Sequence, residues 1–245
     1  MDVLPKGIKI IMNDPKDKII KLIGDIESGK TPADKAWDEI NTIKEEYVAK
    51  LGQQSWNSFI GHRFQGVVHA ILKGYAKKLA DDNRDYVGLK VLTAEEAKRD
   101  EIIMRKLAVK YGNFLLLPDI DSVIVWVDPA HKWESQILAI ISCKTSLRER
   151  IAQACYWKLK LVSSDSQKGI RVFLATADHD DDFSIGNDGK RFNGRSRDRI
   201  ISEHELDGVY ILREDFRVDW ESAKVKRFER IFDDIVEIMK KRPRI

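Results

Sequence analysis

The sequence predicts an α/β protein in which a mixed β-sheet is flanked by helices and joined by an N-terminal helical layer. Two observations support this prediction. Through the first 110 residues, apolar side chains recur at helical spacing, whereas the later chain contains short apolar segments typical of strands. These segments follow the order strand hairpin, helix, strand, strand and closing helix, which is typical of helices packed on a mixed sheet.

Four helices are expected in the N-terminal part of the chain. The first begins at Asp14-Pro15, a good helix start, and Ile19, Leu22 and Ile26 follow at helical spacing. The other three are expected over residues 32–51, 56–79 and 94–109.

The C-terminal part contains the expected strands. These cover residues 113–117, 120–127, 136–143, 170–176 and 208–212. The segment Asp128-Pro129-Ala130-His131 is read as the turn of a hairpin. Helices are expected over residues 146–163 and 219–241.

Composition limits the class of protein. With 245 residues, the chain is expected to hold an N-terminal helical region over residues 1–52 and a core over residues 53–245, or one continuous domain. No apolar window is long enough for a transmembrane helix, and no signal peptide is recognisable. The two cysteines have no metal-binding spacing, which favours a reducing, cytoplasmic setting. A net charge of +3 permits a nucleic-acid partner without requiring one.

The segment Gly24–Thr31, GDIESGKT, satisfies the phosphate-loop pattern of nucleotide hydrolases. Its context does not fit, because such a loop should connect a buried strand to a helix. The preceding segment has helical periodicity, and Asp25 and Glu27 would repel phosphate. We therefore interpret the segment as a helix end followed by a helix start, and nucleotide hydrolysis stays the weaker alternative.

A second constellation lies a hundred residues later. Asp119 and Asp121 stand at the start of one expected strand, and Ser142 and Lys144 at the end of the next. Strand side chains alternate with period 2, so a hairpin can bring the two carboxylates beside the ammonium group in one cleft. Carboxylate oxygens suit Mg²⁺, and a lysine can position water or stabilise charge on phosphorus. This set of groups is that of metal-assisted phosphodiester hydrolysis.

The following segment could recognise bases. Ser146-Leu147-Arg148-Glu149 is a capping box, so a helix is expected directly after the strand that carries Lys144. Its first turn would present Arg148, Glu149 and Arg150. Arginine reads guanine in the major groove and a carboxylate accepts from cytosine, so the triplet could read G·C pairs beside the cut phosphate.

These segments resemble the PD-(D/E)XK nucleases, and most closely the type II restriction endonucleases that recognise CCGG or CCNGG-type sites. Pro118-Asp119 matches the PD element, and Ser142-Cys143-Lys144 matches the S-x-K variant of the second element. Residues 148–150 resemble the R-(D/E)-R recognition motif, and Ala152-Gln153 also matches. Residues 55–65 resemble the helix whose final acid supports the metal site in that family.

Two positions depart from the family pattern. Enzymes with the S-x-K variant usually recover the missing acid fourteen residues after the lysine, where this chain has Lys158. The upstream helix has Gln65, a possible supporting residue, in place of an acid. We therefore expect Asp121 to join Asp119 in the metal site, with the backbone carbonyl of Cys143 as a possible further ligand.

The resemblance implies a Mg²⁺-dependent, sequence-specific double-strand DNA endonuclease with a restriction-endonuclease-like fold. A palindromic site calls for a homodimer, and a cognate DNA methyltransferase is expected by resemblance. The basic run, with Lys190, Arg191, Arg195 and Arg197, would contact backbone phosphate. The alternatives are a catalytically inactive DNA-binding protein and a structure-selective nuclease on the same fold.

Overall fold

The computed structural model describes residues 14–33, 35–147, 151–186, 189 and 191–242. Its centre is a mixed sheet of six strands in the order β1-β4-β5-β6-β7-β8. β1 pairs antiparallel with β4, and β4 with β5, whereas β5, β6, β7 and β8 run parallel. The strands are β1 (Leu89–Thr93), β4 (Ser122–Trp126), β5 (Gln136–Lys144), β6 (Arg171–Thr176), β7 (Gly208–Ile211) and β8 (Val225–Arg227).

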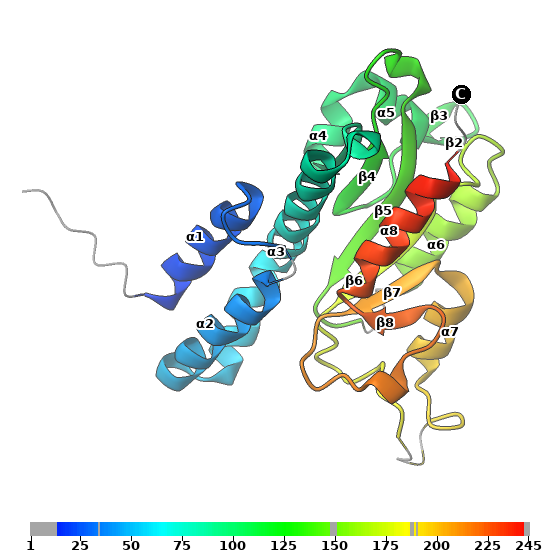
Figure 1. Ribbon diagram of the computed structural model, residues 1–245. Helices are drawn as coiled ribbons and strands as arrows, with labels where there is room; N and C mark the ends of the chain where they lie inside the picture. Colours follow the sequence, from blue (N-terminus) through cyan, green and yellow to red (C-terminus); the bar gives the residue numbers. More distant parts are fainter. Residues whose placement is uncertain (1–13, 34, 148–150, 187–188, 190, 243–245) are drawn as a thin grey trace, which may run out of the picture.

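Helices cover both faces of this sheet (Figure 1). One side carries α1 (Pro15–Glu27), α2 (Ala36–Leu51), α3 (Gln53–Asp82) and α8 (Arg230–Lys241). The other side carries α4 (Ala94–Arg99), α5 (Glu101–Leu107), α6 (Ile151–Val162) and α7 (Arg197–Glu205). A separate hairpin of β2 (Val109–Tyr111) and β3 (Phe114–Leu116) lies outside the main sheet. Short 3₁₀ turns occupy Arg84–Tyr86, Lys132–Glu134 and Val218–Trp220.

The two helical layers define two hydrophobic cores. Along β6, Phe173 and Ala175 face the core beneath α3 and α8, whereas Val172 and Leu174 face the core beneath α6. This alternation follows from the period of 2 in a strand. The central strands are therefore apolar on both faces, as sheets covered on both sides require. The mixed α/β architecture predicted from the sequence is confirmed.

Several element boundaries differ from the predictions. The expected helix over residues 94–109 is broken by Asp100, whose carboxylate caps α5, and the chain then enters β2. The expected helix over residues 219–241 begins only at Arg230, because residues 225–227 pair with β7 as strand β8. Strand β1 was not expected at all.

The phosphate-loop match lies at the end of a helix. Residues Gly24–Glu27 belong to α1, Ser28 caps it, and Gly29 has a positive φ of 80° that suits a residue ending a helix. Lys30 Nζ contacts Asp25 Oδ1 at 3.4 Å. No strand precedes this loop in the described residues, since α1 begins at Pro15. The next helix starts at Ala36, later than the sequence predicted.

None of the helices in the described part of the chain combines the length and the apolar composition that a membrane span requires.

Candidate active site

The site predicted from the sequence lies at one edge of the sheet, where β4 begins and β5 ends. Ser122 of β4 is opposite Ile141 of β5, and the backbone N–H of Asp121 donates to the carbonyl of Ile141 at 3.0 Å. This antiparallel register places Asp121 beside Cys143 and Lys144, the last residues of β5. Asp121 and Cys143, which are 22 positions apart in sequence, are thereby held side by side by the hydrogen bonds of the sheet.

The carboxylate of Asp121 is the centre of this cluster. Its Oδ2 accepts a hydrogen bond of 2.6 Å from the backbone N–H of Cys143 and lies 3.5 Å from Lys144 Nζ. Its Oδ1 accepts a hydrogen bond of 2.5 Å from Nε2 of Gln65, which comes from α3. The side chains of Asp121 and Lys144 are only 11% and 13% exposed. The contact between carboxylate and ammonium expected from strand alternation is therefore present.

Asp119 belongs to the same cluster but is held from the opposite side. Its Oδ2 accepts a hydrogen bond from Nε2 of Gln153, in the first turns of α6. Its charge also acts on Asp121, whose pKa is raised mainly by burial and further by the charge of Asp119. The N–H of Cys143 and the ammonium of Lys144 oppose that rise. Two carboxylates close enough to affect each other are a typical cation-binding arrangement.

The role of Gln153 was not predicted from the sequence. Ala152-Gln153 matches the family pattern, but a glutamine more than thirty residues after Asp119 and Asp121 carries no sign of its partner. The contact becomes visible only once α6 is packed against the sheet. Each carboxylate is thus held by one glutamine amide, Gln65 from α3 on one face and Gln153 from α6 on the other.

The remaining residues of β5 have different environments. Ser142 is buried, and period-2 alternation puts it on the same face of the strand as Lys144. The thiol of Cys143 lies in the core, where burial raises its pKa well above the ordinary value, so it stays protonated. The backbone N–H of Cys143 points toward Asp121, and in a strand the carbonyl of the same residue points to the same side.

The positions expected to supply extra acids contain none. Lys158 Nζ forms an ion pair with Asp207 Oδ2 at 2.5 Å, and this pair lies away from Asp119 and Asp121. Among the described residues, no group of three or more His, Cys, Asp or Glu side chains is arranged to hold a metal ion. The described part of the site therefore offers two carboxylates rather than three.

The predicted DNA-contacting residues are only partly described. Arg148, Glu149, Arg150 and Lys190 lie outside the described residues. Arg191 is 12% exposed and donates to Ser184 and Asp181, so it braces its own loop. Arg195 lies 3.6 Å from Glu203, and Arg197 is exposed at the start of α7.

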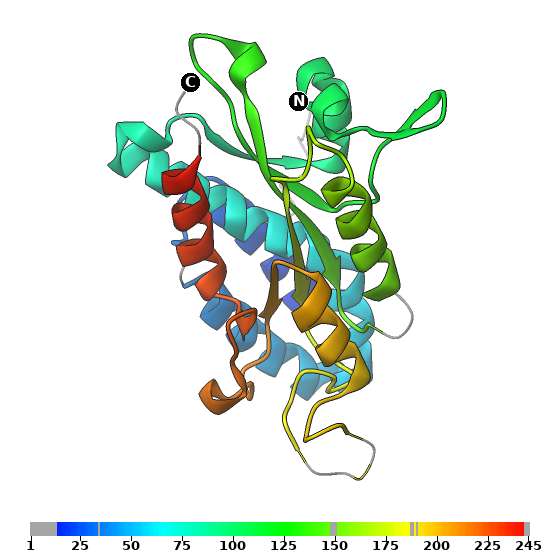
Figure 2. The same ribbon diagram turned by 90° about the vertical axis from the view of Figure 1, so that its right-hand side faces the viewer.

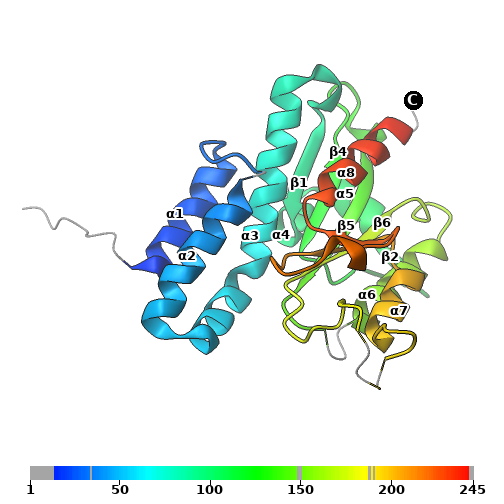
Figure 3. The same ribbon diagram turned by 60° about the horizontal axis from the view of Figure 1, so that its bottom comes forward.

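The loop after β6 leaves the sheet at the same edge as Lys144. The N–H of His179 donates to the carbonyl of Thr145, the residue after Lys144, at 3.0 Å. Asp178 is fully buried and pairs with Arg213 at 2.9 Å, and burial raises its pKa to about 7. Arg199, also fully buried, pairs with Glu203. These contacts brace the start of the loop that carries the basic run, which lies at one end of the molecule (Figures 1 and 3).

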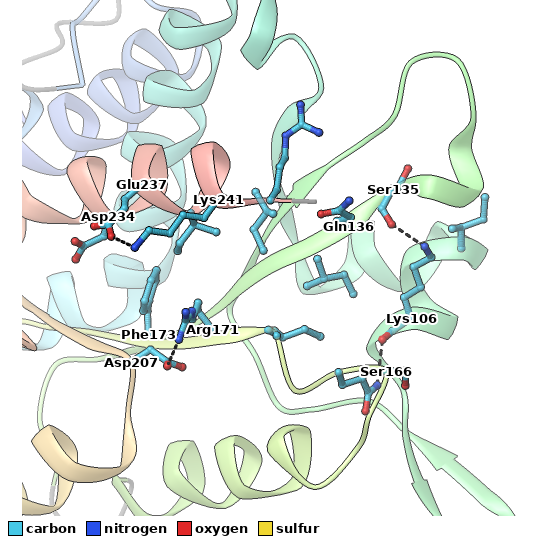
Figure 4. A pocket seen from close by; sticks show the side chains of 18 of the residues that line it. Lys106, Ser135, Gln136, Ser166, Arg171, Phe173, Asp207, Asp234, Glu237 and Lys241 are labelled. Carbon is cyan, nitrogen blue, oxygen red and sulfur yellow. Dashed lines mark hydrogen bonds and ion pairs between the residues drawn. The ribbon is translucent and has the colours of Figure 1, made fainter. Parts of the chain in front are cut away.

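A pocket of about 880 Å³ lies at the opposite ends of the central strands, near Gln136 and Arg171, where β5 and β6 begin. Figure 4 shows its polar side chains, several of which pair with one another. Arg171 bonds Asp207 at 3.1 Å, and Lys106 donates to the carbonyl of Ser135 at 2.7 Å. The pocket is therefore separate from the carboxylate and lysine cluster.

Two carboxylates and a lysine brought together at one edge of an α/β sheet are groups that a phosphodiester hydrolase can use. Comparison with known proteins identifies the family. The profile described as BsaWI restriction endonuclease type 2 matches residues 95–234, more than half of the chain. The chain therefore belongs to this family of type II restriction endonucleases, and it is a type II site-specific deoxyribonuclease.

Two relatives agree with this assignment. A protein of Methanocaldococcus jannaschii, named as a candidate type II restriction enzyme, MjaVIP, is 40% identical over 205 residues. The alignment covers 81% of this chain and 82% of that protein. A protein of Helicobacter pylori, named as a candidate type II restriction enzyme, HpyAORF263P, is 34% identical over 146 residues, 59% of this chain and 71% of the relative.

Proposed function

We propose that this protein is a Mg²⁺-dependent double-strand DNA endonuclease of the PD-(D/E)XK superfamily, which cuts at a short, palindromic site that contains G·C pairs. The observation that supports this proposal best is the meeting of Asp121 with Lys144 at the ends of two adjacent strands. The resemblance of residues 118–119, 142–144 and 148–150 to the CCGG and CCNGG branch supports the choice of site.

The available ligands fit Mg²⁺. This ion prefers oxygen, keeps several waters and is usually bound by one or two carboxylates. Asp121 and Asp119 would supply the carboxylates, and the carbonyl of Cys143 would supply a further oxygen on the side toward Asp121. The raised pKa of Asp121 supports this assignment, because a nearby cation would offset the cost of burying its charge. When bound, Mg²⁺ would lower the pKa of a coordinated water and neutralise charge on the phosphate.

Lys144 would act on the attacking water. Its ammonium lies 3.5 Å from Asp121 and is mostly buried, so its direction is fixed by that contact. An ammonium in this position can orient a water by hydrogen bonding and can stabilise the negative charge that develops on the phosphoryl oxygens. Ser142 would provide a small polar neighbour in place of the usual acid. Gln65 and Gln153 would hold the carboxylates of Asp121 and Asp119 in position.

DNA recognition would come from the same edge of the sheet. Arg148, Glu149 and Arg150 precede α6 directly and would read bases in the major groove. Arg195 and Arg197, with Lys190, would contact backbone phosphates. Arg191 would contribute by holding their loop, because its guanidinium already bonds Asp181. We expect the enzyme in the cytoplasm, acting as a homodimer, with a methyltransferase that protects the host sites.

An inactive DNA-binding protein on this fold is the second candidate function. It is favoured by the neutral amide of Gln65 and by the ion pair of Lys158 with Asp207. The nucleases that this sequence resembles usually carry acids at the positions of Gln65 and Lys158. Such a protein would bind its site in the presence or absence of Mg²⁺ and leave the DNA intact.

The test is incubation with a long phage DNA in Mg²⁺ or in EDTA, followed by gel analysis. Discrete fragments that form only with Mg²⁺ are expected, and sequencing of their ends would give the site. Specific binding without fragments would support the inactive protein. Nicking at junctions without discrete fragments would support a structure-selective nuclease instead.

A further inference from the structure

An apolar surface is exposed beside the candidate active site. It consists of the β2–β3 hairpin and the outer side of α6. On one face the hairpin presents Phe114 and Leu116, which are 72% and 48% exposed, and α6 presents Tyr156, Leu159 and Val162, which are 44%, 58% and 49% exposed. We call these five residues the hairpin–α6 surface. Figure 2 shows the hairpin extending beyond the body of the protein, above α6.

The hairpin and the helix form one continuous surface. The hydroxyls of Tyr111 in β2 and Tyr156 in α6 are 2.6 Å apart. The ammonium of Lys160 lies 5.1 Å from the ring centre of Tyr111 and 5.6 Å from that of Tyr156. Tyr111 is directly opposite Phe114 in the hairpin, so both rings are on the same face of it.

The pattern of α6 is unusual for a helix at the surface. Its inner side packs Ala154, Cys155 and Leu161 into the core, as a helix on a sheet should. Tyr156, Leu159 and Val162 stay exposed on this helix, near the polar side chains of Gln153 and Lys160, although a surface helix normally exposes few large apolar side chains. A group of exposed large apolar side chains typically marks an interaction surface. Within the described residues of this chain, nothing covers these three side chains.

We propose that the hairpin–α6 surface is the dimerisation surface of this enzyme, covered by the same surface of a second copy. The proposal rests on the proposed function, because cutting both strands of a palindromic site calls for two catalytic sites related by a two-fold axis. It goes further by naming the residues that join the two copies.

The position of this surface favours a second copy as the occupant. β3 ends two residues before Pro118-Asp119, and α6 carries Gln153, which bonds Asp119. A contact through these two elements would fix the separation of the two candidate active sites, as cleavage at two defined phosphates requires. The surface is also suited to pairing with itself, because an apolar hairpin and an apolar helix stripe can exchange partners across a two-fold axis.

The size of the surface fits a dimer. Five large side chains exposed by 44% to 72% present on the order of 500 Å² of apolar area, in the upper range for a monomer, and polar neighbours would bring it toward the roughly 800 Å² per partner of a stable interface. Interfaces of permanent homodimers are also more apolar than ordinary protein surface.

The test is the oligomeric state of the full chain without DNA or metal. We expect sedimentation of the unmodified protein to show a dimer at micromolar concentration. Phe114→Glu and Leu159→Glu should each raise the dissociation constant by about 30-fold or more, because each would bury a charge in the interface. Val87→Glu is the matched control, since Val87 is 53% exposed and lies before β1, outside this surface. It should leave the dimer intact.

A second measurement uses only the unmodified protein, so it does not depend on the variants folding. Hydrogen exchange should slow in residues 109–116 and 151–162 as the concentration rises through the dissociation constant. A monomer at every concentration, or dimers of both glutamate variants as tight as that of Val87→Glu, would overturn the proposal. Protection of this surface by duplex DNA alone would also overturn it and make the surface a DNA contact. An inactive protein that still dimerises here would refute only the proposed function.

Discussion

Asp121 has the environment of a functional residue. Its carboxylate is 11% exposed, which costs free energy, and three partners reduce that cost: the N–H of Cys143, the amide of Gln65 and the ammonium of Lys144. These partners do not offset the cost completely, since its pKa is raised. A carboxylate kept in such a place at the expense of stability is typical of sites where charge is used.

His69 gives a prediction for the pH dependence of stability. It lies in α3, is 6% exposed, and its Nδ1 is 3.0 Å from the hydroxyl of Ser122, next to Asp121. Burial lowers its pKa below 6.5, and the charge of Lys73 lowers it further, against weaker effects of Glu96 and Glu27. Below pH 6.5 the unfolded chain therefore binds a proton that the folded protein does not, so acid destabilises the fold through this group.

The variant His69→Asn should remove that contribution. Compared with the variant, the unmodified protein should lose up to about 1.4 kcal/mol of unfolding free energy for each pH unit below 6.5, and the difference should be constant above pH 7. Urea unfolding between pH 5 and pH 8 measures it. A difference that does not change with pH would show that His69 binds its proton equally well in both states.

Contacts between individual residues could be predicted from the sequence where strand geometry determines which side chains lie side by side. The contact of Asp121 with Lys144 follows from period-2 alternation and a hairpin, and it was predicted. Which aspartate contacts the lysine was not, because that depends on a register in which Ser122 pairs with Ile141. Gln153 could not be assigned, because its contact with Asp119 depends on how α6 packs.

Helix α6 combines three features in twelve residues. It follows the proposed recognition triplet directly, its Gln153 holds Asp119, and its outer side forms part of the hairpin–α6 surface. Base reading, carboxylate position and dimer contact would therefore be coupled through one rigid element. A displacement of α6 would be expected to change all three.

We predict that Gln153→Ala weakens cleavage by about 10-fold to 100-fold, the usual effect of losing a residue that orients a metal ligand. The loss should be largest at low Mg²⁺ and should shrink as Mg²⁺ is raised, because Asp119 would then be held by the ion instead of the amide. Cleavage rates across a Mg²⁺ titration measure it. Ser163→Ala, just beyond the end of α6, is the control. A loss independent of Mg²⁺ would mean that Gln153 acts in another way.

The elements were predicted best where they are long and apolar. β5, β6 and β7 were located within a residue or two, because buried parallel strands read as continuous apolar runs. β8 was read as helix, since Val225-Lys226-Arg227 is short and polar and becomes a strand only by pairing with β7. The break at Asp100 was missed because helical spacing continues through it. The triplet 148–150 lies outside the described residues, so its expected geometry stays a prediction.

Elements from both helical layers of the molecule contact the candidate site at one edge of the sheet. Gln65 reaches Asp121 from the layer of α3, and Gln153 reaches Asp119 from the layer of α6, so both helical layers hold the candidate catalytic groups. The apolar core beneath α3 includes residues from α1, α2 and α8 as well as from the sheet. The helices that precede the site in sequence are therefore part of the packing that holds Gln65 in place.

The most direct test compares Asp121→Asn and Lys144→Ala with Asp128→Asn, a partly exposed aspartate just beyond the far end of β4. The DNA site identified by fragment sequencing would be the substrate. We predict that the first two variants cut at least about 10³-fold more slowly in Mg²⁺, a loss of about 4 kcal/mol of transition-state stabilisation. Both should still bind that site in a gel shift, whereas Asp128→Asn should cut normally. Normal cleavage by either Asp121→Asn or Lys144→Ala would contradict the assignment of this cluster as the catalytic centre.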